Sequence, residues 1–248
     1  MTEKRKRDAK ADQDGPKTLA EYQRLFERFE NYGDTLVFPD THLIIRMDGR
    51  RYGAAWDKAD IDYPYDKRVF DALVETAKAL YDVGYKINYS FIHGDEISLL
   101  FDLNESLNPR KRGRLVSGLA SAAALNFAQA LGLCVLFHTK LLELPSREHV
   151  ADYFIWQRKV AMRNLTGALL SDRLKREGKS PQEINAEIGR LLLEERESLA
   201  RERGLITDKT PGWILRGAGV IQKNGKFLVE TKLPESDADY LKLLEEVI

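Results

Sequence analysis

The sequence predicts an α+β fold of the split βαβ, ferredoxin-like kind: an antiparallel sheet with helices on one face, followed by a helical C-terminal part and a β-hairpin. Three observations predict it. Apolar runs and segments of helical periodicity follow one another in the order strand, helix, strand, strand, helix, strand. A short turn containing Gly94 and Asp95 separates the second and third strands, and Asn224-Gly225 marks a later hairpin.

The first elements are a helix, a strand and a second helix. Thr18 and Glu21 form a capping box that opens the first helix. Residues 42–47 are an apolar run typical of a buried strand. Residues 66–84 carry apolar side chains at helical spacing and end on a glycine, which is the pattern of an amphipathic helix.

The core is completed by two strands, a long helix and a final strand. The strands are predicted at residues 85–92 and 97–103. An alanine-rich helix is predicted from Pro109 to residue 131, and the last strand covers residues 133–144. Pro145 then ends the strand, because proline has no amide proton to donate.

The C-terminal part is mostly helical. Ser180, Pro181 and Glu183 form the start signal of one of its helices, with serine at the cap and glutamate three residues later. The predicted elements are helices at 150–178, 180–204 and 236–248 and strands at 213–221 and 227–232.

Composition restricts the class of protein. The 248 residues are 43% hydrophobic, enough for a substantial core, and the formal net charge is zero, so any nucleic-acid site must be a local basic patch. The single cysteine, Cys134, excludes a disulfide framework or a cysteine zinc site. No apolar run approaches a membrane span and residues 1–17 contain no signal-peptide core, so we expect a cytoplasmic protein with no membrane partner.

Carboxylates are predicted to converge at one edge of the sheet. In a split βαβ fold the first and third strands are antiparallel neighbours, so Asp48, just past the first strand, lies near Asp95 and Glu96, just before the third. Clustered carboxylates repel one another and are suitable ligands for Mg²⁺. Gly49 would let a phosphate or metal approach the backbone. The alternative is that Asp48-Gly49 and Gly94-Asp95 are ordinary turns.

Several motifs in this order resemble the tRNA(His) guanylyltransferase superfamily, whose members add nucleotides in the 3′-to-5′ direction. The similarity spans roughly residues 22–220. The matching segments are Arg46-Met47-Asp48-Gly49-Arg50, Pro64-Tyr65-Asp66, Asp95-Glu96-Ile97-Ser98-Leu99-Leu100-Phe101, Phe137 leading to Leu144-Pro145-Ser146, Asp152-Tyr153-Phe154-Ile155-Trp156, and Arg163-Asn164.

The resemblance implies a polymerase-palm-like fold and a two-metal-ion nucleotidyltransferase that extends the 5′ end of tRNA. It implies two Mg²⁺ ions, with ATP and GTP as substrates, and a homotetramer. The metal ligands would be the Asp48 carboxylate, the Gly49 carbonyl and the Asp95 carboxylate, with Glu96 as a further catalytic residue. Residues 18–146 would form the palm-like catalytic core, and residues 147–248 a mainly helical part packed on it.

The resemblance also implies binding residues for the substrates. The predicted nucleotide and triphosphate contacts are Arg46, Gly49, Arg50, Lys111 and Arg114, and the predicted tRNA contacts are Lys159, Arg163 and Asn164. A charge run such as that around Lys111 is by default a solvated face, although a helix N-terminus also favours phosphate. Lys159 and Arg163 share a helix face, so a bound phosphate or a nearby carboxylate must relieve their repulsion. The run Lys4-Arg5-Lys6-Arg7 lies in a predicted disordered basic tail, either merely solvated or an RNA-gripping arm.

Departures from the family pattern concern the choice of substrate. Gly94 stands where serine is common, and Val160 replaces an acidic residue. Residues 162–165 take the place of a His-Ile-Asn-Asn-type motif, and the aromatic ending expected after Arg216 is missing. These features resemble the bacterial and archaeal branch that is associated with templated repair of tRNA 5′ ends, and not specifically with tRNA(His).

Two other functions compete with this interpretation. His93-Gly94-Asp95-Glu96-Ile97 also resembles the hairpin of diguanylate cyclases, which share the palm, although the helical C-terminal part argues against a cyclase. A non-catalytic RNA-binding module on the same scaffold would stack bases on strand aromatics, and residues 97–103 offer only Phe101.

Overall fold

The computed structural model describes residues 18–27, 35–51, 58–62, 64–105 and 111–248. The predicted basic tail at residues 1–17 and the predicted helix start at Pro109 lie outside these ranges. None of the helices in the described ranges is both long enough and apolar enough to cross a bilayer.

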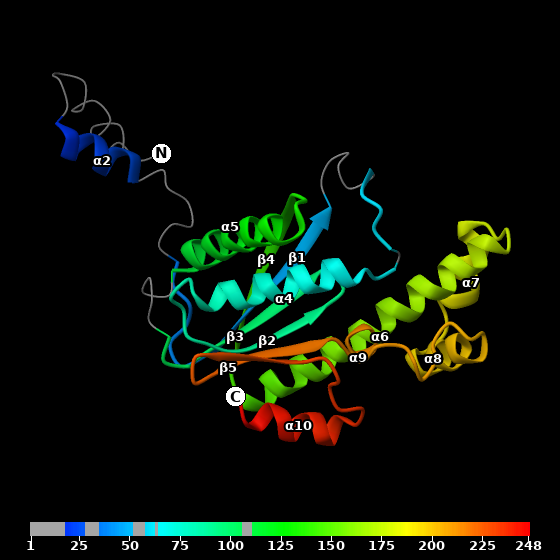
Figure 1. Cartoon of the computed structure of the whole chain (residues 1–248). Coiled ribbons are helices and arrows are strands. Elements are labelled where there is room, and N and C mark those ends of the chain that lie inside the picture. Colours follow the sequence, from blue (N-terminus) through cyan, green and yellow to red (C-terminus); the bar gives the residue numbers. More distant parts are fainter. Residues whose placement is uncertain (1–17, 28–34, 52–57, 63, 106–110) are drawn as a thin grey trace, which may run out of the picture.

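The centre of the protein is a six-stranded sheet in which every neighbouring pair is antiparallel (Figure 1). The strand order is β4-β1-β3-β2-β5-β6. The strands are β1 (His42–Arg51), β2 (Ile87–His93), β3 (Glu96–Phe101), β4 (Val135–Leu144), β5 (Ala218–Lys223) and β6 (Lys226–Glu230). The first four have the order of the predicted split βαβ fold, and the C-terminal hairpin extends the same sheet beyond β2.

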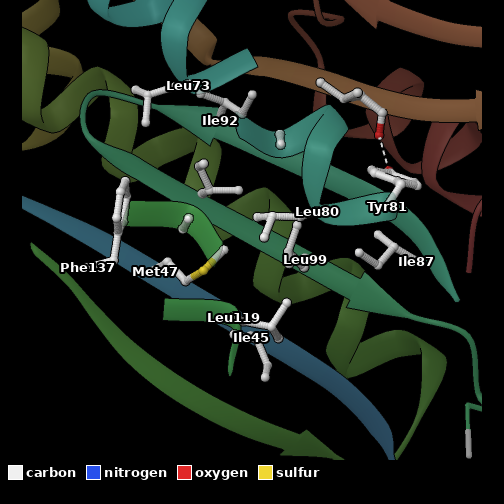
Figure 2. Close-up of a cluster of buried hydrophobic side chains, with 14 of the residues drawn as sticks. Ile45, Met47, Leu73, Leu80, Tyr81, Ile87, Ile92, Leu99, Leu119 and Phe137 are labelled. Carbon is white, nitrogen blue, oxygen red and sulfur yellow. Dashed lines mark hydrogen bonds between the residues drawn. The ribbon is translucent and has the colours of Figure 1, made fainter. Parts of the chain in front are cut away.

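Two helices, α4 (Lys67–Tyr81) and α5 (Arg112–Leu131), cover one face of the sheet (Figure 1). Side chains of a strand alternate between faces, so β1 sends Ile45 and Met47 into this layer. Figure 2 shows Met47 beside Leu99 of β3 and Leu119 of α5 in the resulting cluster. At its rim the Tyr81 hydroxyl donates a 2.8 Å hydrogen bond to the carbonyl of Val220, which ties α4 to β5.

The opposite face is covered by the C-terminal part. The helices α6 (Arg147–Arg176) and α10 (Asp237–Glu245) pack there on Ile44 of β1 and Tyr89 of β2 (Figure 1). Buried Arg158 of α6 donates hydrogen bonds to α10 and the segment before it, and its guanidinium carbon lies 4.9 Å from the centroid of the Tyr240 ring. The C-terminal part is therefore the second covering layer of the core sheet.

Capping side chains set the helix starts. In α4, Asp66 accepts a 2.7 Å hydrogen bond from the amide of Arg68, which satisfies a donor that the helix itself cannot pair. Ser146 caps α6, so this helix begins immediately after the strand-ending Pro145 and not at Val150. The N-terminal helix α2 (Leu19–Glu27) opens with the predicted capping box, in which Glu21 accepts from the amide of Thr18 at 2.7 Å.

The single helix predicted at residues 180–204 is wrong. The structure has two helices, α7 (Pro181–Ile188) and α8 (Leu193–Glu202), separated at Gly189, a residue of low helix propensity. Glu195 supplies a second start signal that the sequence pattern did not reveal, because it accepts a 2.7 Å hydrogen bond from the amide of Leu192. The break lets both short helices pack on the end of α6 in one apolar cluster.

The strand predicted at residues 213–221 is wrong in its first half. Residues Gly212–Arg216 form the short helix α9, and the strand starts only at Ala218. Tertiary contacts select the helix, because the Trp213 ring stacks on Phe70 with centroids 4.3 Å apart. Gly217, at φ +78° and ψ −171°, makes the change of direction into β5.

Candidate active site

Asp48 lies inside β1, directly opposite Glu96 of β3 and His138 of β4. The sequence pattern predicts it just past the strand, but β1 continues to Arg51 because β4 pairs with it as far as that residue. Residues directly opposite in an antiparallel pair project to the same face, so the Asp48 and Glu96 carboxylates share the α6 side of the sheet. Of the predicted convergence of carboxylates, the strand pairing therefore shows the Asp48 and Glu96 pair.

The β2–β3 turn brings Asp95 to the same edge. Gly94 has φ +57°, and the amide of Gly49 donates a 2.9 Å hydrogen bond to the carbonyl of Asp95. A Cβ atom on residue 49 would lie 3.1 Å from that carbonyl oxygen, tighter than usual for such a contact. The glycine thus lets the turn dock on β1, and both the Asp48 and the Asp95 side chains are exposed to solvent at this edge of the sheet.

The Glu96 carboxylate is half-buried and lies among polar side chains of the protein. Its carboxylate lies 3.8 Å from the Arg46 Nε, 3.6 Å from the His93 Nε2 and 3.4 Å from the Gln157 amide nitrogen. Burial raises the pKa of Glu96 above its ordinary value; Arg46 and Gln157 oppose this effect, and the charge of Asp48 adds to it. Glu96 is therefore an anchored carboxyl group, whereas Asp48 and Asp95 present exposed ones.

A buried polar network lies behind Glu96. The Gln157 amide donates to the Tyr153 hydroxyl at 2.9 Å and to the Ser98 hydroxyl at 3.2 Å, and these two hydroxyls are 2.8 Å apart. Sequence reasoning missed this network. The available signal was Gln157, a polar residue four positions after Tyr153 on a helix face that also carries apolar Phe154 and Val150. The network fixes α6 against β3 at the position of Glu96.

Acidification is expected to destabilise the protein through His93, which is 3% exposed. Burial lowers the pKa of His93 from 6.5 to about 4, so between these pH values the unfolded chain binds a proton that the folded chain does not. The contribution of neutral His93 to the free energy of unfolding is complete above pH 6.5. It is lost as the pH falls toward 4, which lowers this free energy by about 3 kcal/mol. Urea denaturation at several pH values should show the free energy of unfolding falling with pH over this range in wild type, and falling less steeply in His93→Phe.

The matched control is His138→Phe, which removes an exposed histidine from the same face of the sheet. This variant should keep the wild-type slope. Equal slopes in His93→Phe and wild type would contradict the assignment of the acid sensitivity to His93.

A pocket of about 210 Å³ opens beside the carboxylate edge, on the α4 side. Gly49, Gly94 and Asp95 form one end of it. The remainder is mostly aromatic and apolar, with Tyr65, Phe70, Phe127, Phe137 and Trp213 among its lining residues. An aromatic cavity that ends at the exposed Asp95 carboxylate has the shape and lining of a site for a flat base.

Two of the predicted tRNA residues lie next to this pocket. Asn164 lines both it and an adjoining open cleft of about 450 Å³, which Arg163 and Arg196 also line. Lys159 is instead bound to Asp237 of α10, with nitrogen and oxygen 2.9 Å apart. The Asp237 carboxylate therefore relieves the repulsion between Lys159 and Arg163. Arg163 itself remains exposed at the cleft.

The structure does not bring Lys111 and Arg114 to the carboxylate edge. Lys111 caps the N-terminus of α5, and its neighbour Arg112 forms an ion pair with Glu143. Glu143 pairs with Leu43, whereas Asp48 pairs with His138, so about 17 Å of strand separates the two positions. These two predicted triphosphate contacts lie at the other end of the sheet from Asp48. Arg50, by contrast, is exposed two residues after Asp48 on the same strand.

The donor set is compatible with magnesium. Asp48 and Asp95 offer hard carboxylate oxygens at an exposed edge, and Asp95 also lines the neighbouring pocket. Among the described residues, no group of three or more His, Cys, Asp or Glu side chains is placed so that it could hold a metal ion, so the protein would contribute at most two such ligands at this edge. Mg²⁺ commonly uses one or two protein carboxylates and completes its shell with water and substrate phosphates, so the edge fits this ion.

An antiparallel sheet of this order, with acidic residues on its first strand and at the following hairpin, is the palm-type fold of nucleotidyl-transfer enzymes. The family model described as tRNAHis guanylyltransferase matches residues 20–147, just over half of the chain. The chain belongs to this family, and the resemblance found in the motifs is confirmed.

Individual relatives agree in fold and family. The tRNA(His) guanylyltransferase of Debaryomyces hansenii is 29% identical over 152 residues, which are 57% of this chain and 56% of that protein, so the match spans about half of the relative. A bacterial tRNA(His) guanylyltransferase-like protein, solved in complex with ATP, superimposes with a TM-score of 0.74 at 21% identity, over 91% of this chain and 99% of that one. The tRNA(His) guanylyltransferase from Saccharomyces cerevisiae superimposes with a TM-score of 0.69 at 18% identity, over 83% of this chain and 94% of that one.

Proposed function

We propose that this protein is a template-directed 3′-5′ nucleotidyltransferase that repairs the 5′ end of tRNA by two-metal-ion catalysis. The observation that carries the proposal is the edge at which Asp48 faces Glu96 and Gly49 binds the Asp95 turn, next to an aromatic pocket. Family membership supports the reaction class. Structural relatives solved with ATP and with GTP support nucleoside triphosphates as substrates.

The exposed carboxylates of Asp48 and Asp95, with the carbonyl of Gly49, would hold two Mg²⁺ ions. When bound, the ions would stabilise the charge on the attacking and leaving oxygens of an in-line displacement. In that reaction the 3′-hydroxyl oxygen of the incoming nucleotide attacks the 5′ phosphorus of the RNA. The bond to the activating group breaks, and AMP or pyrophosphate leaves.

The protein side chains would bind and orient the reactants. The aromatic pocket that contains Tyr65 and Trp213 would receive a base, and Arg163, which lines the adjoining cleft, would bind a phosphate. Arg50 would bind a phosphate on the face of the sheet that carries Asp48. Arg46 has a different position from the one predicted, because it faces Glu96 and is only 17% exposed. Its role would be to keep the Glu96 carboxyl in place.

Templating by base pairing fits the residues that depart from the family. Val160, at the position of the usual acidic residue, is 7% exposed and packs in the core, so it cannot read a base. Pairing across the acceptor stem can then supply the selectivity, because A-form stems are gripped by shape and backbone. We further propose that the enzyme acts as a homotetramer in the cytoplasm.

The decisive experiment varies the template nucleotide opposite the missing 5′ residue. A tRNA shortened at its 5′ end is incubated with each nucleoside triphosphate and Mg²⁺, and the added base is identified for all four template bases. We expect the added base to be the Watson–Crick partner of the template in each case.

Two results would overturn parts of the proposal. Addition of G whatever the template, and only to tRNA(His), would exclude the repair function while leaving the chemistry intact. Conversion of GTP alone to a cyclic product, with no change in the RNA, would replace the proposal with a cyclase.

A further inference from the structure

Trp156 is an exposed aromatic residue on an otherwise well-packed part of α6. Its neighbours Tyr153, Phe154 and Gln157 are buried against the sheet, whereas Trp156 is 46% exposed. The guanidinium carbon of Arg46 lies 5.5 Å from the centroid of the Trp156 ring, within cation–π range. A large aromatic surface is thus held in place by β1 and left partly open to solvent.

Three cationic side chains lie on the same face of the sheet as this ring, and one of them, Arg46, is beside it. Lys140 of β4 pairs directly with Arg46, and Arg50 lies two residues beyond Asp48, so all three project to the same face. Lys140 and Arg50 are exposed, and within the described part of the chain neither forms an ion pair with a carboxylate. Arg46 is paired with Glu96, and Asp48 lies between Arg46 and Arg50 on the same face, so Lys140 and Arg50 are the cations that an anionic ligand would meet.

The patch of Trp156 and these cations adjoins the proposed catalytic edge. Arg46 contacts both Trp156 and Glu96, whose carboxylate is 3.8 Å from its Nε, and Asp48 follows Arg46 on the same face of β1. A ligand lying on Trp156 would be one side-chain layer away from the carboxylates. Aromatic residues flanked by cations are typical of sites for single-stranded nucleic acid, in which bases stack on rings and phosphates meet Lys and Arg.

We propose that Trp156, backed by Arg46 and with Lys140 and Arg50 on the same face of the sheet, is a stacking platform for an unpaired base of the RNA substrate. This inference rests on the proposed function and adds a single-strand subsite to it. A second copy of the chain is a less suitable occupant, because the centres of protein interfaces are depleted of charged residues and this face carries Arg46, Lys140 and Arg50. The ring would hold the single-stranded end of the acceptor stem, at which the template base is exposed.

The first test observes Trp156 directly. The sequence contains three tryptophans, so protein labelled with 5-fluorotryptophan should give three fluorine resonances, and the one missing from Trp156→Phe belongs to Trp156. An RNA hairpin with a short 3′ overhang should shift this resonance, and a blunt hairpin of the same stem should not. No shift with the overhang RNA, at concentrations where binding is seen by other means, would overturn the platform.

The second test measures affinity and kinetics. Trp156→Leu keeps an apolar side chain without a π-face and should weaken binding of the overhang RNA about tenfold, while Trp156→Phe stays within about threefold of wild type. For Trp156→Leu the KM for RNA should rise, with the KM for the nucleoside triphosphate unchanged. Equal losses with the blunt hairpin would mean a merely structural role and would exclude the platform.

The outcomes separate this inference from the proposed function. Overhang-specific binding through Trp156 without nucleotide transfer would retain the platform and remove the catalytic proposal. Template-directed transfer with RNA binding and KM unchanged in Trp156→Leu would retain the catalytic proposal and remove the platform. A Trp156 resonance that shifts with protein concentration in the absence of RNA would assign the ring to contact between copies, against the platform.

Discussion

Asp48→Asn is expected to lower the rate of nucleotide transfer about a thousandfold, which corresponds to roughly 4 kcal/mol of transition-state stabilisation. The amide keeps the size of the carboxylate but loses the charge with which Asp48 would bind Mg²⁺. Folding should not suffer, because Asp48 is exposed and its charge opposes the ionisation of Glu96 on the neighbouring strand. Single-turnover transfer to a 5′-shortened tRNA, together with thermal unfolding, measures both effects.

The control for this prediction is Asp71→Asn. Asp71 is exposed on α4, where it forms a surface ion pair with Lys67, so its loss should leave transfer within about twofold of wild type. Transfer by Asp48→Asn within a few-fold of wild type would remove this residue from the metal site.

Gly217→Ala is expected to destabilise the fold by about 4 kcal/mol. At φ +78° any side chain is strained, and a Cβ atom here would lie 2.5 Å from the Cζ of Phe91 and 2.7 Å from the carbonyl oxygen of Ile92. Both neighbours belong to β2 and cannot move without disturbing the sheet that carries the Asp95 turn. The free energy of unfolding from urea denaturation provides the measurement.

Gly225→Ala separates strain from crowding. Gly225 has φ +72°, similar to Gly217, but a Cβ atom on residue 225 would meet no atom within 4 Å beyond its chain neighbours. Only the backbone strain of about 1 kcal/mol should therefore appear. Equal destabilisation by the two substitutions would mean that the contact with Phe91 contributes nothing.

The fold of the core could be predicted because its determinants are local. Alternating apolar runs and helical periodicity in residues 42–144 define a strand and helix order that has few compact solutions. Once that order is known, antiparallel pairing of the first and third strands brings Asp48 to Glu96 without further information. The motifs at these residues also identified the family correctly.

Features that depend on tertiary contacts could not be predicted. Trp213 has the β-propensity of a strand residue, but its stacking on Phe70 requires a helical turn. Nothing near Lys159 in the sequence indicates that Asp237, 78 positions later, neutralises it. The position of Lys111 at the far end of the sheet follows from the register of β4 on β1, which sequence patterns specify only after the fold is known.

The pairing of β2 with β5 has a consequence for the order in which the protein forms. Ser90 and Val220 are neighbours in the sheet although 130 positions separate them in the chain, and contacts of such separation form slowly because a long loop must close first. During synthesis, β2 remains an unpaired sheet edge until β5 has been made and released. Such an edge is a template for association with other chains, so the strand next to the Asp95 turn is open to wrong pairing while the C-terminal part is still being made.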